Sequence, residues 1–83
     1  MDWKDKFEST FGCKAILWSL IYPRAMLLIN SEGIPPLSEV GAFFTREVPE
    51  VSSVRIVTRN NKFVHFFKPS HHEDWRVSKS SDD

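Results

Sequence analysis

The stretch RNNKFVHFFKP, residues 59–69, constrains the fold of this 83-residue chain more than any other. Asn60 and Asn61 tolerate the left-handed backbone of tight turns, so the stretch predicts the tip of a β-hairpin. Residues 63–67 that follow are aromatic or β-branched at every position but one, and they predict the second strand of that hairpin. The alternating, β-branched segment VSSVRIVT, residues 51–58, predicts the first strand.

The length of the turn decides which aromatic side chains face the core. A strict two-residue turn places His65 in the core. One more residue in the loop, as in a bulged turn, moves every side chain of the second strand to the opposite face and buries Val64 and Phe66. The outer face then carries three rings and a cation: Phe63, His65, Phe67 and Arg55. We favour the bulged register because it buries no ionisable group except Lys62, which can reach water from the tip of the hairpin.

The N-terminal third predicts one helix and two strands. Residues 3–11 place aromatic side chains on one helical face, and Gly12 follows where glycine often ends a helix. Residues 15–22 are apolar on both faces, which indicates a buried strand, with a short buried helix as the alternative. Residues 26–29 form a short apolar run before a turn cluster and predict a central strand.

Two further segments carry helix signals. Residues 37–47 repeat apolar side chains at three- and four-residue spacing, and the predicted helix begins after two prolines and stops at Pro49. Ser70 and Glu73 have the spacing of a capping box, which predicts a second helix over residues 71–77.

These elements predict an α+β fold. The order strand, helix, strand, strand from residue 26 onward is typical of a ferredoxin-like β-α-β-β unit, on which the N-terminal helix and strand would pack. We expect a single α+β domain over residues 1–77 and a flexible acidic tail over residues 78–83.

Two segments carry a family resemblance. Residues 26–31 are an aliphatic run that ends near an asparagine, and residues 59–66 can be aligned with the strand signature K/R-G-F/Y-G/A-F-V-x-F/Y. Four residues match that signature: Arg59, Phe63, Val64 and Phe66. On these motifs residues 25–76 resemble an RNA recognition motif, although the usual fourth strand is missing. The resemblance implies single-stranded RNA binding by stacking on sheet rings, but Leu27 and Asn61 stand at two of the ring positions.

Basic charge is concentrated in the same segment, which an anionic partner or a solvated face would explain equally well. Formal net charge is zero, yet residues 51–79 carry six basic and two acidic side chains. Six residues are candidates for contacting single-stranded RNA: Arg55, Arg59, Lys62, Phe63, His65 and Phe67. Three alternatives remain open for their face: burial under the N-terminal segment, a protein partner, or nucleic acid. Trp75 is a candidate anchor for a protein partner, or a ring that closes the second helix onto the sheet.

Other function classes find little support in the sequence. The chain has no glycine-rich phosphate loop and no nucleophile elbow, so we expect a small non-enzymatic binding protein, with an adaptor or regulatory subunit as the alternative. Adjacent histidines in HHED, residues 71–74, point apart, so we expect no metal and no cofactor. Cys13 is the lone cysteine. With no signal-like or membrane-spanning segment, it suggests an intracellular protein.

Overall fold

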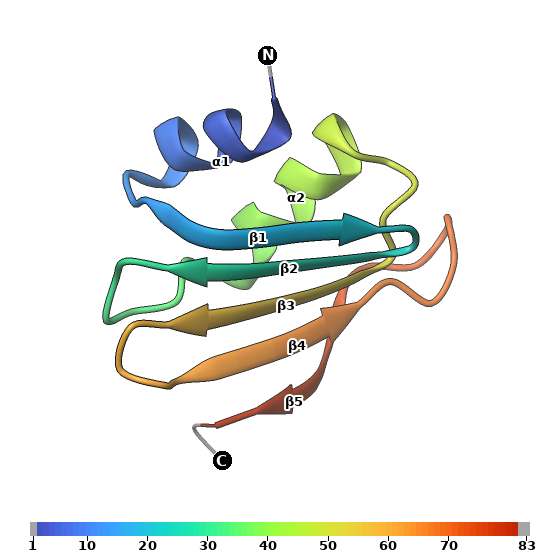
Figure 1. Cartoon of the computed structure of the whole chain (residues 1–83). Helices are drawn as coiled ribbons and strands as arrows, with labels where there is room; N and C mark the ends of the chain where they lie inside the picture. The colour runs from blue at the N-terminus through green and yellow to red at the C-terminus, as the bar shows by residue number, and fades with distance from the viewer. Residues whose placement is uncertain (1, 82–83) are drawn as a thin grey trace.

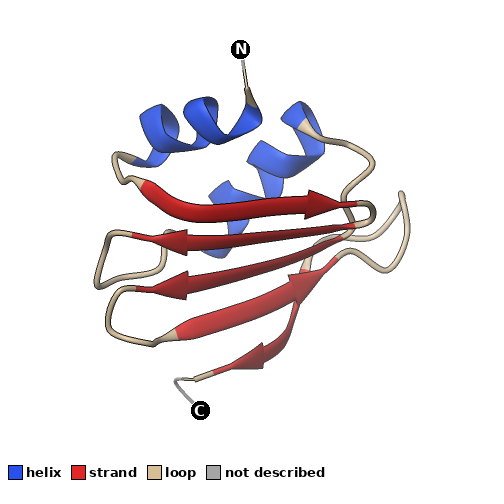
Figure 2. Cartoon of the chain, viewed as in Figure 1, coloured by secondary structure: helices blue, strands red, loops and turns tan. Residues whose placement is uncertain are grey.

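The computed structural model describes residues 2–81, which form two helices and one five-stranded sheet (Figure 1). The elements, in chain order, are α1 (Trp3–Phe11), β1 (Ala15–Ile21), β2 (Arg24–Ile29), α2 (Leu37–Glu47), β3 (Ser53–Thr58), β4 (Phe63–Phe67) and β5 (Arg76–Ser80). The strands lie side by side in their sequence order (Figure 2). Only β2 and β3 run parallel, so the sheet is mixed and the predicted α+β class is confirmed.

The predicted ferredoxin-like order is not confirmed. In that unit another strand lies between the two strands that the helix joins. Here α2 joins β2 to β3, and these strands are direct neighbours in parallel register, with Leu27 opposite Ile56. The hairpin partner β4 lies on the outer side of β3.

The hairpin between β3 and β4 has the bulged register that the sequence favours. Val54 lies opposite Phe66 and Ile56 opposite Val64, and these four side chains are buried. The amide of Thr58 donates to the carbonyl of Lys62 at 2.8 Å, which closes a three-residue loop. Asn61, the last residue of that loop, has φ of 66°, the left-handed conformation that such loops require.

The buried core lies between one face of the sheet and the two helices. α1 ends at Gly12, whose φ of 67° allows its amide to donate to the carbonyl of Glu8. Phe7 of α1 is fully buried, and its ring lies 5.5 Å from Phe43 and 6.2 Å from Phe44 of α2. These contacts hold α1 on the same side of the sheet as α2. Of the three alternatives for the face that carries the β4 rings, burial under the N-terminal segment is therefore excluded.

The C-terminal segment differs from the prediction. The hydroxyl of Ser70 accepts the amide of His72 at 3.3 Å, as a helix cap would, and donates to the carboxylate of Glu73 at 3.2 Å, but only turns follow. The predicted helix over residues 71–77 is wrong, because the chain extends into β5 and pairs with β4. Residues 78–80 belong to this strand rather than to a tail, and residues 82–83 lie outside the described residues.

Trp75 fixes the start of β5 against α2. Its indole Nε1 donates to the hydroxyl of Thr45 at 3.1 Å, and its ring meets Phe66 edge-on at 5.2 Å. A Cβ added to Gly41 would lie 2.5 Å from the indole Cδ1, so the glycine makes room for the ring. Trp75 thus closes β5, and not a second helix, onto the core.

Candidate nucleic-acid interface

The face of the sheet that points away from the helices is uncovered by any described element. We call it the open face, and its side chains form three rows across the strands. The first row is Leu17, Leu28, Val57 and Phe63. The second row is Ser19, Met26, Arg55, His65 and Lys79. The third row is Ile21, Arg24, Ser53, Phe67 and Arg76.

One ring of β4 stands in each row. Phe63, His65 and Phe67 alternate with the buried side chains of the same strand and are all half-buried. Alternate residues of a strand lie about 6.6 Å apart, so the rings are separated by about twice the 3.4 Å rise of stacked bases. Bases that stacked on successive rings would have to be separated from one another, which requires an unpaired, extended strand.

Neighbours on β3 orient two of these rings. The guanidinium of Arg55 lies 4.9 Å from the centre of the Phe63 ring, within the range of a cation–π contact. The hydroxyl of Ser53 lies 2.8 Å from Nε2 of His65, and these atoms share a hydrogen bond. The rings are therefore positioned before any ligand arrives.

The charged side chains of the open face are all basic. No strand residue in the three rows is acidic. Arg24, Arg55 and Lys79 make no ion pair within residues 2–81, whereas the guanidinium of Arg76 binds Glu73 at 2.9 Å. Three cations are thus available to an anion without breaking an existing pair.

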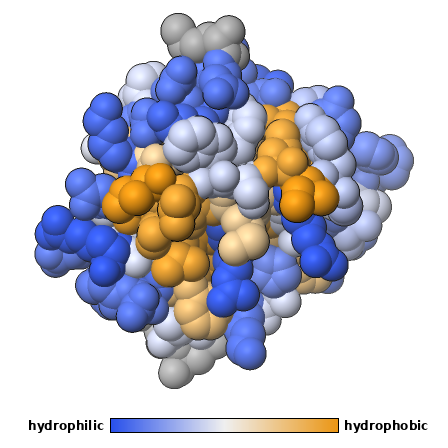
Figure 3. All heavy atoms as spheres, viewed as in Figure 1, coloured by the Kyte–Doolittle hydropathy of each residue, from blue (hydrophilic) through white to orange (hydrophobic). Residues whose placement is uncertain are grey.

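The first row is apolar throughout. Leu17 is 63% exposed and borders a shallow depression of about 180 Å³ whose lining includes Leu28 and Val57. Figure 3 shows hydrophobic atoms gathered over the strands on the viewed side of the molecule, in two groups separated by more polar atoms. The open face therefore combines an apolar row with a basic and aromatic area.

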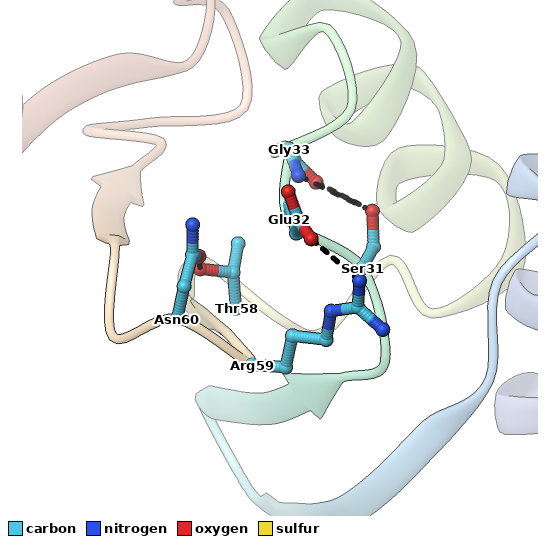
Figure 4. Close-up of polar contacts among 6 residues, drawn as sticks. All are labelled: Ser31, Glu32, Gly33, Thr58, Arg59 and Asn60. Carbon is cyan, nitrogen blue, oxygen red and sulfur yellow. Dashed lines mark hydrogen bonds and ion pairs between the residues drawn. The ribbon is translucent and has the colours of Figure 1, made fainter.

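Two predicted site residues lie away from the open face. Arg59 sits in the β3–β4 loop, where its guanidinium binds Glu32 (Figure 4). Its amide donates to the carbonyl of Ser31. The hydrogen bond from Arg59 lowers the pKa of Glu32, so its carboxylate is charged at neutral pH. Lys62 lies opposite Thr58, whose side chain is on the helix side of the sheet.

The predicted site is thus only partly assembled. The structure brings Arg55, Phe63, His65 and Phe67 together on the open face, while Arg59 and Lys62 lie at the loop. Trp75 contacts the core on the opposite side of the sheet. The sequence reasoning missed Arg24 and Lys79. The only sequence signal for Arg24 is its position directly before the apolar run of β2. Lys79 has no such signal, because β5 has no apolar periodicity that would predict a strand.

The lone cysteine shows no sign of an activated thiol. Burial raises the pKa of Cys13, and the negative charge of Glu8 raises it further, so the thiol stays protonated at neutral pH. The carboxylate of Glu8 instead accepts the amide of Ala15 at 2.7 Å, and this hydrogen bond is the main cause of its lowered pKa. Glu8 therefore connects α1 to the start of β1.

Comparisons with protein-family models, with curated proteins and with solved structures found no match to this chain. Within the described residues, neither helix has the length and apolar character needed to cross a membrane.

Proposed function

We propose that this protein is a non-enzymatic binder of single-stranded RNA that uses the open face of its sheet. The observation that carries the proposal is a line of three rings along β4, beside three cations that make no ion pair within residues 2–81, on a face with no acidic strand residue. A base stacked on one such ring contributes about 1–3 kcal/mol by the usual measure of alanine substitution. The proposal rests on this geometry, and the resemblance to an RNA recognition motif remains a hypothesis.

The cations set the expected dependence on salt. If Arg24, Arg55 and Lys79 each neutralise one phosphate, the logarithm of the association constant falls with the logarithm of salt with a slope of about −2. Raising monovalent salt from about 50 to about 200 mM would then weaken binding roughly 20-fold.

A fluorescence anisotropy titration with a ten-nucleotide single-stranded RNA tests the proposal. We expect binding at low salt that weakens as calculated. Arg55→Gln should lower the affinity and reduce the salt slope by about 0.7, since one phosphate contact is lost. Arg59→Gln is the matched control, because Glu32 already binds that guanidinium and its loss should change neither quantity. Absence of binding at low salt would overturn the proposal.

The apolar first row favours a second candidate, an adaptor that binds another protein. Leu17, Leu28 and Val57 form a continuous exposed or half-exposed strip, and such strips mark protein interaction sites when they are large. Binding through this strip would change little with salt and would be lost in a Val57→Asp variant. Absence of RNA binding at low salt in the titration above would favour this second candidate.

A further inference from the structure

The two edges of the sheet differ in how they are protected against pairing with another chain. β5 is five residues long, carries Arg76 and Lys79, and has an irregular register with β4. Short length, charge and bulges are devices that keep an edge strand from pairing. β1 is seven residues long and contains no charged residue, with its irregularity confined to its start at Ile16. In the described chain no strand pairs with its outer side.

The hydrogen-bond pattern identifies which backbone groups of β1 point outward. The amide of Asn30, just beyond β2, donates to Lys14 before β1, while the carbonyl of Pro23 accepts from Ser53 in β3. Even-numbered residues of β2 therefore bond to β1, because backbone groups alternate in direction along a strand. Their partners in β1 are Ile21, Ser19 and Leu17. The N–H and C=O groups of Trp18 and Leu20 consequently point away from the sheet.

We propose that β1 pairs with β1 of a second copy of this chain, antiparallel and centred on Ser19. In this register Trp18 of each copy lies opposite Leu20 of the other, and the outward backbone groups of these residues exchange four hydrogen bonds. Ser19 meets its own counterpart at a position without backbone hydrogen bonds, where strands approach most closely and a small residue fits.

The side chains of β1 are complementary to themselves in this register. Leu17, 63% exposed, lies opposite Ile21 of the second copy, which is 75% exposed. On the helix side Trp18, 47% exposed, lies opposite Leu20. Every pair of strand residues across the interface is thus apolar or a serine pair. The ammonium of Lys4 lies 4.6 Å from the centre of the Trp18 ring, and its charge is paired with Glu8 and Asp5 of α1. This self-complementarity favours a second copy over an unrelated strand.

The pairing closes at two copies. The β1 edges of the two copies pair with each other across one two-fold axis. The edges that remain free in the dimer are the two β5 strands, which carry charged residues. Antiparallel continuation keeps the same face of each sheet on the same side, so the two open faces would join into one surface across ten strands.

Sedimentation equilibrium of the full chain tests this inference. The test compares variants that carry a positive or a negative side chain at position 19. We expect the wild type to have twice the 9.7 kDa mass of one chain. Ser19→Lys and Ser19→Glu should each be monomeric, because like charges would lie directly opposite one another. An equimolar mixture of the two variants should associate again. Ser78→Lys, on the exposed β5 edge, is the matched control and should remain dimeric.

Amide hydrogen exchange supplies a second measurement that also reports folding. The amides of Trp18 and Leu20 should be protected in the wild type and exchange rapidly in Ser19→Lys. The amide of Ser19, which bonds to β2, should be protected in both. A wild type that stays monomeric up to about 1 mM, where an association of only about 4 kcal/mol is half complete, would overturn the inference. So would a Ser19→Lys dimer or a mixture of the two charge variants that fails to associate.

Discussion

Replacing Gly41 by alanine should destabilise the protein, although alanine is the better helix former. Gly41 lies inside α2 beneath the Trp75 ring. An added Cβ would lie 2.5 Å from Cδ1 and 2.9 Å from Cγ of that ring, so the indole would have to move by about 1 Å to regain van der Waals contact. The ring is held by its hydrogen bond to Thr45 and by its edge contact with Phe66. Displacement would weaken both.

The two opposing effects can be weighed. Overpacking a fitted site costs about 1–3 kcal/mol, and removing a helical glycine returns about 0.8–1.0 kcal/mol. We therefore expect Gly41→Ala to lower the free energy of unfolding by about 1 kcal/mol in urea denaturation.

The same substitution in a Trp75→Ala background isolates the contact. Without the indole, only the helix effect remains, so Gly41→Ala should then stabilise the chain by about 0.8 kcal/mol. The change of sign is the decisive result. Equal effects in the two backgrounds would refute the placement of Trp75 over Gly41, and with it the way β5 is fixed to α2.

Substitutions at three further positions test other features of the structure. Asn61→Ala should lower the free energy of unfolding by about 1–2 kcal/mol because of its left-handed backbone, while Asn61→Gly should be tolerated, as urea denaturation can show. Glu32→Gln should leave RNA affinity and its salt slope unchanged, measured by anisotropy, because the Glu32–Arg59 pair lies in the loop, away from the open face. Glu8 has a lowered pKa in the folded chain, so its stabilising effect is present above the unfolded value near 4.5 and is lost as the pH falls through the folded value. Glu8→Gln should therefore make the decline in melting temperature below about pH 4.5 shallower, and an unchanged decline would argue against the bond to Ala15.

The sequence was most informative where local chemistry and burial agree. The hairpin register followed from two constraints, an Asn-Asn turn that accepts left-handed backbone and a strand in which one register buries an imidazole. The two helices were equally readable, because their apolar side chains recur at helical spacing and glycine or proline ends them.

The order of the strands in the sheet could not be predicted from the sequence in this way. A strand-helix-strand-strand sequence has the same apolar pattern whether β4 lies between β2 and β3 or outside them. Periodicity likewise shows that α1 has an apolar face, without saying which face of the sheet it covers. The packing of Phe7 on Phe43 and Phe44 decides this in the structure.

The C-terminal strand was missed because its local signals are misleading. Ser70 does accept a backbone amide, that of His72, as a helix cap would, but such a bond does not propagate a helix without an apolar face to bury. Pairing with the free edge of β4 and the anchoring of Trp75 stabilise an extended segment instead. Because β5 was not predicted, its residue Lys79 could not be assigned to the candidate site.

The most direct test of the open face as a binding surface is the affinity of a Phe63→Ala/Phe67→Ala double variant for the ten-nucleotide RNA. Both rings are half-buried on the open face and make no contribution to the opposite core, so the variant should remain folded, as circular dichroism can verify. Loss of two stacking rings should weaken binding by at least about 30-fold, which corresponds to about 1 kcal/mol for each ring. A folded double variant that binds RNA within twofold of the wild type would contradict the proposed function.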